Sequence, residues 1–298
     1  MTIAKANIVR LASDCSELGE GPHYDRARDT AYWFDITGCR LHEHRFACGE
    51  TVSHVLPRMA SVIARIDDDR QMLAMEDGIY VRDRLGGGLD LLVGLEADKP
   101  ANRSNDGRVH PSGRLWIGTM SKTSERAAGA IYWSDGKTVR TLWDGISIPN
   151  SICFSPDGTV GHFADTGANK IWRVAVDPAT GLPRGEPDLF LSGGDLPLGG
   201  WFDGSVTDAD GVLWNAAWGG GSVSGFAPDG TLVNTFEVPA GQTSCPCFVG
   251  GNLDRMLVTT AWQGYSEAKR AADPGAGYSY LVDGHFHGMA DADFRLDA

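Results

Sequence analysis

Residues 150–158 read Asn-Ser-Ile-Cys-Phe-Ser-Pro-Asp-Gly, in which a polar residue precedes a short apolar run and a Pro-Asp-Gly turn. The same frame occurs twice more, because Asn105 stands eight residues before Gly113 and Asp203 stands eight before Gly211. Glycine in such turns accepts a positive φ, so each frame predicts a short strand followed by a tight turn. The recurrence indicates an internal repeat.

The repeat extends along the whole chain. Glu20, Ser61 and Pro246 are the further positions in the same phase, and the six positions are separated by 41, 44, 45, 53 and 43 residues. Short runs rich in Val, Ile, Trp, Tyr and Phe follow each turn, which is typical of strands. Only 266–272 has the pattern of a short helical turn. Four strands repeated at this period predict an all-β fold, a six-bladed β-propeller whose four-stranded antiparallel blades surround a central channel.

Domain organisation follows from the same pattern. Nothing in the 298 residues resembles a linker, so we expect a single propeller domain over residues 1–298. The run Ile8–Ala12 belongs to no complete repeat of its own. We expect it to supply a strand to the sixth blade beside Phe286–Leu296, which would close the ring and remove two exposed sheet edges.

Composition and motifs exclude several classes of function. The net charge of −13 argues against nucleic acid as a partner. The chain shows no signal peptide and no apolar run of membrane-spanning length, so we expect no membrane partner and a cytoplasmic location. It also has no nucleophile elbow, no His-Glu-x-x-His and no phosphate-binding glycine loop. Metal-assisted chemistry, or no chemistry, remains.

The repeated phase itself predicts a site. The first strand of each propeller blade lies nearest the axis, so Glu20, Asn105, Asn150 and Asp203 would converge. Two carboxylates in a narrow channel repel each other unless a cation or a proton intervenes. With amide oxygens beside them they form an all-oxygen set that suits Ca²⁺, Mg²⁺ or Mn²⁺, with Zn²⁺ as an alternative. The competing interpretation is structural, because Asp and Asn are common in turns at strand starts.

Residues near the phase positions are candidates for substrate contact. Arg103 is placed to hold substrate oxygens, although it could equally pair with a surface acid. Asp106 is placed to brace Arg103. Trp201, Phe202 and Trp218 would either wall a sugar-sized pocket or fill space between blades. The polar segment Ser121–Ala128 reads as a loop that either covers the channel or is simply solvated.

Several short motifs, in order, resemble the SMP-30/gluconolactonase/regucalcin-like family. The resemblance covers about residues 15 to 265. It implies a six-bladed propeller with one catalytic divalent metal ion, and an enzyme that hydrolyses sugar lactones. Its motifs are Leu18-Gly19-Glu20-Gly21-Pro22, Asn102-Arg103-Ser104-Asn105-Asp106-Gly107, Gly118-Thr119-Met120, Pro149-Asn150-Ser151, Phe202-Asp203-Gly204 and Thr243-Ser244-Cys245.

The resemblance assigns roles by position. Glu20, Asn150 and Asp203 match the family's metal ligands, with calcium as the expected ion. Arg103 and Asn105 match residues that hold the substrate, and Asn105 lies nearer the metal in some relatives. Asp203 also matches the proposed general base.

Two positions depart from the family pattern. Phe202 stands where many members have proline, and Ser151 stands where many have glycine. The segment Ser121–Ala128 does not align with an acidic substrate contact of some members, so Glu125 receives no such role.

The expected function is therefore metal-dependent hydrolysis of an aldono-1,4- or 1,5-lactone to its aldonic acid in sugar catabolism. The small-molecule sugar lactone would be the partner, and the chain would act as a monomer or small homo-oligomer. Two alternatives remain open: a calcium-binding regulatory propeller like regucalcin, and a metal-dependent esterase or phosphotriesterase acting on a non-sugar substrate.

Overall fold

The computed structural model describes residues 7–12 and 14–296, and almost all of its regular structure is antiparallel β-strand. Residues 1–6, 13 and 297–298 of the predicted domain lie outside these ranges. Within them there is one α-helix, α1 (Glu267–Ala272), with two short 3-10 turns, η1 (Thr166–Ala168) and η2 (Gly193–Asp195). The predicted all-β class is confirmed, and the expected helical turn is present. No helix of the described residues is long and apolar enough to cross a membrane.

Four separate sheets each consist of four consecutive strands. The first contains β2 (Gly19–Asp25), β3 (Thr30–Asp35), β4 (Arg40–Arg45) and β5 (Glu50–Val55). The second contains β6 (Ala60–Arg65), β7 (Arg70–Met75), β8 (Gly78–Asp83) and β9 (Leu89–Gly94). The third contains β10 (Asn102–Val109), β11 (Leu115–Ser121), β12 (Gly129–Ser134) and β13 (Val139–Ile146). The fourth contains β14 (Pro149–Phe154), β15 (Val160–Asp165), β16 (Lys170–Val176) and β17 (Pro183–Ser192).

The remaining strands form two four-stranded groups that meet at one residue pair of the described chain, Trp218 and Gln242. One group contains β18 (Trp201–Thr207), β19 (Leu213–Trp218), β20 (Ser222–Phe226) and β21 (Leu232–Glu237). The other contains β22 (Gln242–Val249), β23 (Arg255–Ala261), β24 (Tyr280–Asp283) and β1 (Asn7–Arg10).

The N-terminal strand joins the last sheet as predicted, but its predicted neighbour was wrong. β1 pairs antiparallel with β24, where Ile8 lies opposite Val282. Phe286–Leu296 is not a strand. Its backbone groups bond to loops and a strand end that belong to different sheets, so it cannot follow one strand for any length.

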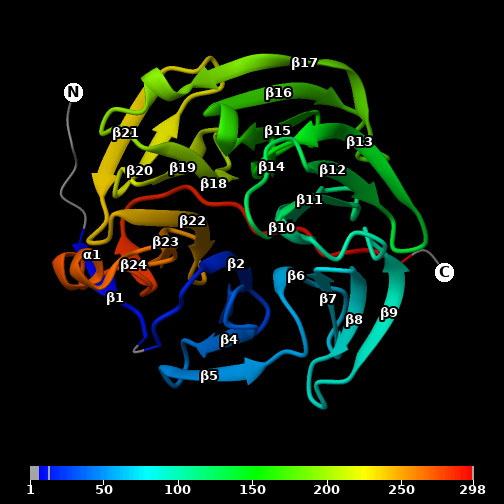
Figure 1. The fold of residues 1–298 in the computed structure, drawn as a ribbon, viewed down its shortest axis with the longest axis horizontal. Helices are drawn as coiled ribbons and strands as arrows, with labels where there is room; N and C mark the ends of the chain where they lie inside the picture. The colour runs from blue at the N-terminus through cyan, green and yellow to red at the C-terminus, as the bar shows by residue number, and fades with distance from the viewer. Residues whose placement is uncertain (1–6, 13, 297–298) are drawn as a thin grey trace.

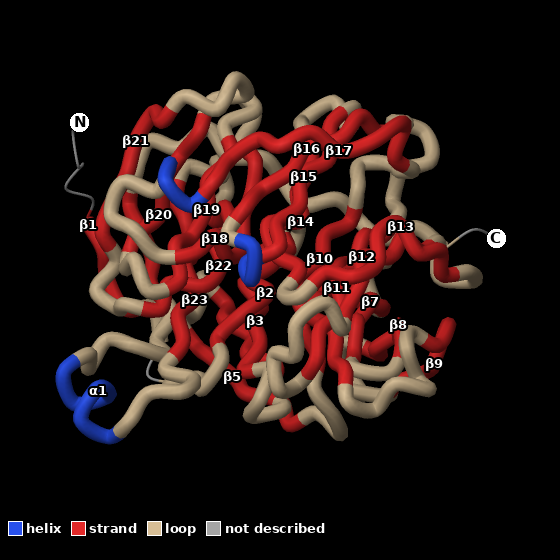
Figure 2. The backbone as a smooth tube through the Cα atoms, turned by 45° about the horizontal axis from the view of Figure 1, so that its top comes forward, coloured by secondary structure: helices blue, strands red, loops and turns tan. Residues whose placement is uncertain are grey.

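The first strand of each group lies on the inside of a ring (Figure 1). Contacts run from β2 to β6, β10, β14, β18 and β22, and β22 contacts β2 again. Successive strands then lead outward, and β5, β9, β13, β17 and β21 lie at the periphery (Figures 1 and 2). This radial arrangement is that of a β-propeller.

Apolar side chains fill the spaces between neighbouring sheets. In one such cluster Trp116 of β11 packs edge-on against Phe154 of β14, with ring centroids 5.0 Å apart. In another, Tyr32 and Phe34 of β3 pack with Leu73 of β7. Each sheet therefore buries both faces near its middle, where second strands such as β3 and β11 are buried along their whole length.

Every inner strand carries a break in its pairing register with the second strand. The shifts fall at Glu20/His23, Ala60/Val62, Ser104/Gly107, Asn150/Cys153, Phe202/Ser205 and Thr243/Cys245. Such β-bulges bend a strand and re-aim its side chains. Five of the six sequence-predicted phase positions lie at these breaks. Pro246 lies beyond the break in β22, so that sixth phase position was placed too late in the chain.

Residues 284–296, here called the C-terminal strap, cross one end of the ring (Figure 1, red). The strap is held by backbone hydrogen bonds: Gly288 N–H donates to Leu253, Phe294 N–H to Arg65 and Arg295 N–H to Gly113, at 2.8–3.0 Å. Phe294 is buried in the apolar cluster between the second and third sheets. The strap therefore ties together blades that are distant in sequence.

Asp291 is the strap's charged anchor. Its carboxylate pairs with Arg108 of β10 and lies 3.2 Å from His23 Nδ1. The Arg108 and Asp291 side chains are only 13% and 12% exposed, so the pair is largely desolvated. Burial would raise the pKa of Asp291, but the Arg108 charge and the His23 contact hold it well below its usual value.

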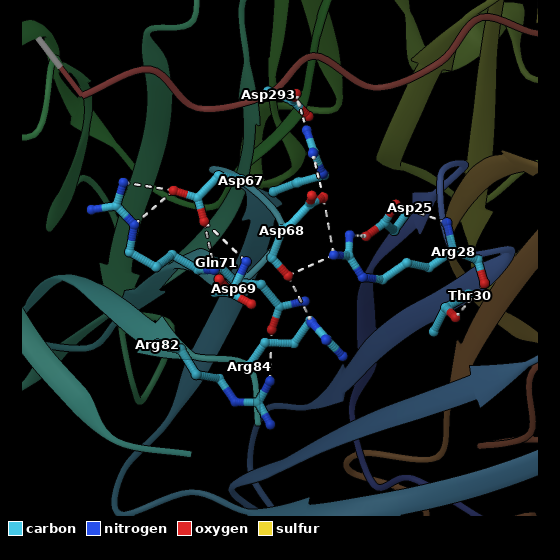
Figure 3. Close-up of polar contacts among 12 residues, drawn as sticks. Asp25, Arg28, Thr30, Asp67, Asp68, Asp69, Gln71, Arg82, Arg84 and Asp293 are labelled. Carbon is cyan, nitrogen blue, oxygen red and sulfur yellow. Dashed lines mark hydrogen bonds and ion pairs between the residues drawn. The ribbon is translucent and has the colours of Figure 1, made fainter. Parts of the chain in front are cut away.

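A second anchor, Asp293, belongs to an exposed charged network. Arg65 donates to Asp293 at 2.6 Å and to Asp68 at 3.0 Å. Asp68 also accepts from Arg28, which pairs with Asp25 (Figure 3). This network links the strap to the first two sheets at the outer surface.

We expect Asp291→Asn to lower the free energy of unfolding by about 3 kcal/mol near neutral pH, because it leaves the Arg108 charge buried without a partner. Asp293→Asn is the matched control on the same strap. Its ion pair is solvent-exposed, so the loss should be below about 1 kcal/mol. Urea denaturation of both variants measures the difference, and equal losses would contradict the anchoring role of Asp291.

The Asp291 contribution should also depend on pH. Its folded-state pKa is depressed, so its stabilisation is complete above the unfolded-state value of about 4 and is lost as pH falls below it. The stability gap between the wild type and Asp291→Asn should therefore stay constant from about pH 7 to about pH 5 and shrink below about pH 4.

Candidate metal and substrate site

A cavity of about 170 Å³ opens where the inner strands begin, at the opposite end of these strands from the strap. Its walls combine charged, amide and apolar side chains. They are Leu18, Glu20, Arg103, Asn105, Met120, Ser124, Ile148, Asn150, Thr166, Asp203, Trp218 and Gln263.

All five residues to which the sequence assigned a metal or substrate role line this one cavity. Glu20 comes from β2, Arg103 and Asn105 from β10, Asn150 from β14 and Asp203 from β18. Each is buried, with between 3% and 8% of its surface exposed. The structure therefore brings together residues spread over 184 positions, although their chemical roles remain a proposal.

A continuous chain of hydrogen bonds fixes the amides. Arg103 Nη1 donates to Asn105 Oδ1 at 2.6 Å, and Asn105 Nδ2 donates to Asn150 Oδ1 at 3.0 Å. Asn150 Nδ2 then donates to Thr166 Oγ1 at 2.8 Å, and that hydroxyl donates to the Phe202 carbonyl at 2.6 Å. Because its Nδ2 is held by Thr166, Asn150 turns its amide oxygen toward the other site residues.

The cavity holds more negative charge than it neutralises. Burial, and then repulsion from Asp106, raises the pKa of Glu20 above its usual value. Burial and the charges of Glu20 and Asp106 raise the pKa of Asp203 well above its usual value. The Arg103 guanidinium opposes both shifts, although burial lowers its own pKa. An added cation would relieve this repulsion.

The oxygen set fits a hard divalent cation. Two carboxylates and the fixed amide oxygen of Asn150 are ligand types that Ca²⁺ accepts, with waters completing the shell. Among residues 7–12 and 14–296, no group of three or more His, Cys, Asp or Glu side chains could hold a metal ion. Amide oxygen would therefore have to take part in binding a metal at this site.

Asp106 does not brace Arg103 as the sequence predicted. Its carboxylate accepts from the Ile152 backbone N–H at 2.7 Å, and the cation that lowers its pKa most is Arg108. Burial outweighs these effects, so the pKa of Asp106 is raised. Asp106 is not part of the cavity wall and instead lines a small space with Arg108 and Asp291 at the strap end of the ring.

Only one of the two tryptophans lies at the cavity, and the predicted loop contributes one residue to the cavity wall. Trp218 lines the cavity, whereas Trp201 is 51% exposed and lies outside it. From the segment Ser121–Ala128, Ser124 forms part of the wall with a left-handed backbone (φ 57°).

Sequence reasoning missed Thr166 and Gln263. Thr166 follows β15 and Gln263 follows β23, so each lies beyond a second strand rather than on an inner one. A repeat frame based on inner strands gives no signal for either position.

Two residues in the bulges, Gly21 and Ser151, have a left-handed backbone that restricts which side chain can stand there. Gly21 has φ 56°, and a Cβ there would lie 2.0 Å from the Ser61 carbonyl oxygen, so only glycine fits. Ser151 adopts φ 53° although it is not glycine. Its hydroxyl donates to the Asp203 carbonyl at 2.5 Å and lies 2.8 Å from Ser205 Oγ, which offsets the backbone strain and fixes the strand that carries Asp203.

The chain belongs to the SMP-30/gluconolactonase/LRE-like family, whose model matches residues 18–262. The matched region contains the whole cavity except Gln263, which follows it directly.

Relatives and solved structures are similar over nearly the whole chain. A protein from Rhizobium meliloti (strain 1021) is 49% identical over 96% of each chain. It bears the provisional name of sugar lactone lactonase. The L-arabinolactonase of Azospirillum brasilense is 33% identical over 95% of this chain and 94% of its own. The crystal structure of a calcium-binding protein, regucalcin, from Agrobacterium tumefaciens superposes with a TM-score of 0.94 at 44% identity, covering 99% and 98% of the two chains.

The position of Thr166 predicts that it controls the affinity for a divalent cation. Thr166→Val removes the hydroxyl that holds Asn150, so we expect affinity for Ca²⁺ to fall about 10-fold. Thr166→Ser keeps the hydroxyl and should stay close to the wild type. Competition with a fluorescent chelator measures affinity without any substrate, and an unchanged affinity in Thr166→Val would remove the orienting role.

Ser151 leads to a stability prediction. Ser151→Ala keeps the strained backbone and loses the hydroxyl bonds, so it should lower the free energy of unfolding by about 2 kcal/mol. Ser151→Gly loses the same bonds but relieves the strain, so its cost should be smaller. Chemical denaturation compares the two, and a larger loss in the glycine variant would show that strain is not important here.

Proposed function

We propose that this protein hydrolyses a sugar lactone, an aldono-1,4- or 1,5-lactone, to the corresponding aldonic acid with the help of one divalent metal ion. The observation that carries the proposal is the convergence of Glu20, Asn150 and Asp203, with Arg103 beside them, on one buried cavity. Family membership and the L-arabinolactonase relative support the same reaction.

The size and lining of the cavity favour a small polar substrate. Its volume of about 170 Å³ is below the range of roughly 300–1,000 Å³ that is common for drug-sized ligands. Arg103 and three amides line the space, which suits a monocyclic lactone that carries hydroxyl groups. A bulky aryl ester or phosphotriester would fit this lining less well.

The side chains divide the work between metal and substrate. Glu20, Asn150 and Asp203 would hold the cation, and calcium is the expected ion because a structural neighbour is a calcium-binding protein. When bound, the ion would supply the Lewis acidity that polarises the lactone carbonyl. Zn²⁺, Mg²⁺ and Mn²⁺ are alternatives that the oxygen ligands also accept.

Asp203 would act as the general base. It would accept a proton from the water that adds to the carbonyl carbon, after which the ring C–O bond breaks and the leaving oxygen takes up a proton. Arg103 and Asn105 would orient the ring by hydrogen bonds, which fixes the direction of attack. The Arg103 charge would also offset negative charge that develops on substrate oxygen.

The architecture that accompanies this function is a single six-bladed propeller. The closed contact circuit of six inner strands supports the blade count. We further propose a cytoplasmic protein that acts as a monomer or small homo-oligomer, without nucleic acid or membrane partners.

A second candidate is calcium binding without turnover. It is favoured by the 0.94 TM-score with the calcium-binding regucalcin structure. The two candidates share the metal ligands, but only the lactonase needs Arg103 and Asn105 to contact a substrate.

Hydrolysis of pentono- and hexonolactones, followed by acid release in a pH-stat, tests the proposal. Chelated protein should be inactive, and added Ca²⁺, Zn²⁺, Mg²⁺ or Mn²⁺ should restore turnover. Asp203→Ala should lower kcat at least about 1,000-fold, because it removes both a ligand and the base. Asp293→Asn, which alters a carboxylate on the strap, should keep full activity.

Two results would reject this function. Full activity after complete metal removal would exclude the metal-dependent mechanism. Tight Ca²⁺ binding without turnover of any lactone in the panel would instead favour the regulatory candidate.

A further inference from the structure

The Gln263 amide belongs to the polar groups of the cavity wall that are not tied to another part of the protein. Among the described residues, the Gln263 amide group makes no hydrogen bond. The other amides and Thr166 are bonded to one another in the chain that starts at Arg103. Gln263 therefore keeps a free donor and a free acceptor at the cavity wall.

The backbone that carries this amide is fixed. Gln263 N–H donates to the Glu17 carbonyl at 3.0 Å, and the neighbouring Trp262 N–H donates to the same carbonyl at 3.0 Å. The Gln263 carbonyl accepts from Gln242 Nε2 at 3.1 Å. The side chain is thus presented by a held segment, so less order has to be gained when it meets a ligand.

The order of the ring places Gln263 across the cavity from Arg103. Arg103 lies on β10, and β22 is three inner strands away in either direction around the ring. Gln263 follows β23, the strand paired with β22. A molecule in the cavity would therefore have Arg103 and Asn105 on one side and Gln263 on the other.

The surroundings of Gln263 match a sugar. Leu18 forms a bridge with Ala261, and Trp218 pairs with Gln242, so both apolar side chains line the wall next to the Gln263 segment. Sugar rings present apolar C–H faces together with hydroxyls that both donate and accept. The apolar wall can pack against the C–H face of a sugar, and the neutral amide can donate to and accept from its hydroxyls. The amide carries no positive charge that would attract an anionic substituent.

We propose that Gln263 is a specificity-determining residue that hydrogen-bonds the ring or side-chain hydroxyls of the bound lactone on the side opposite Arg103. The preferred substrates are then uncharged, polyhydroxylated lactones. This inference rests on the proposed lactonase function and adds the groups by which the substrate is selected.

The test compares lactones with and without hydroxyl groups. Gln263→Met keeps the side-chain volume and removes the hydrogen-bonding groups. For xylono-1,4-lactone and glucono-1,5-lactone we expect KM to rise about 3- to 10-fold, the loss of one neutral hydrogen bond, with kcat changed less than about 2-fold. For γ-butyrolactone and δ-valerolactone, which have no hydroxyls, kcat/KM should stay within about 2-fold of the wild type.

Two further variants complete the design. Gln263→Ala should show the same discrimination and keeps the test usable if the methionine variant folds poorly, which thermal unfolding reports. Asn234→Met makes a similar change on the peripheral strand β21 and should leave both lactone classes unaffected.

The outcomes separate the two proposals. If both lactone classes are affected equally, or neither is, Gln263 does not read hydroxyl groups and the inference is wrong. If the wild type hydrolyses no lactone with any metal, the lactonase function fails and the inference falls with it.

Discussion

Two carboxylates withdrawn from water at the hub of the ring are the constraint on which the site depends. Burial raises the pKa of both Glu20 and Asp203, and repulsion adds to it, from Asp106 on Glu20 and from Glu20 and Asp106 on Asp203. Arg103 is the nearby cation that opposes both shifts. The amide chain from Asn105 to Thr166 has no net charge to add, so it sets geometry and leaves the charge imbalance for a ligand to correct.

The inner-strand bulges make that concentration of charge structurally possible. A regular strand would alternate its side chains and divide them between channel and blade. The register breaks in all six inner strands turn selected side chains toward the axis, and at two of them the backbone adopts a left-handed conformation that ordinary side chains rarely tolerate. Gly21 meets this need by lacking a Cβ, whereas Ser151 meets it by bonding its hydroxyl to the strand of Asp203. The fold and the site are therefore built from the same local irregularity.

The sequence predicts the parts that repeat. The spacing of the repeats predicted the strands and sheets. The shared position of Glu20, Asn105, Asn150 and Asp203 within their repeats predicted that they would meet in one cavity. Thr166 and Gln263 could not be found in this way, because each follows a second strand and has no counterpart in the frame. The strap was misjudged for a related reason: residues 284–296 bond to loops from several blades, and a pattern of local pairing does not encode such contacts. Asp106 shows that the repeat does not predict side-chain partners. The sequence predicted Arg103 as its partner, whereas its carboxylate accepts from the Ile152 backbone N–H and interacts with the Arg108 charge.

The strap limits the routes by which a ligand can enter and leave the ring. At the strap end, a space lined in part by Asp106, Arg108 and Asp291 has a volume of about 20 Å³, which is room for roughly one water molecule. The strap crosses this end of the ring, and the cavity opens at the other end, so we expect a ligand to enter and leave through that one mouth. A molecule formed in the cavity would then have to leave through this mouth before the next could enter.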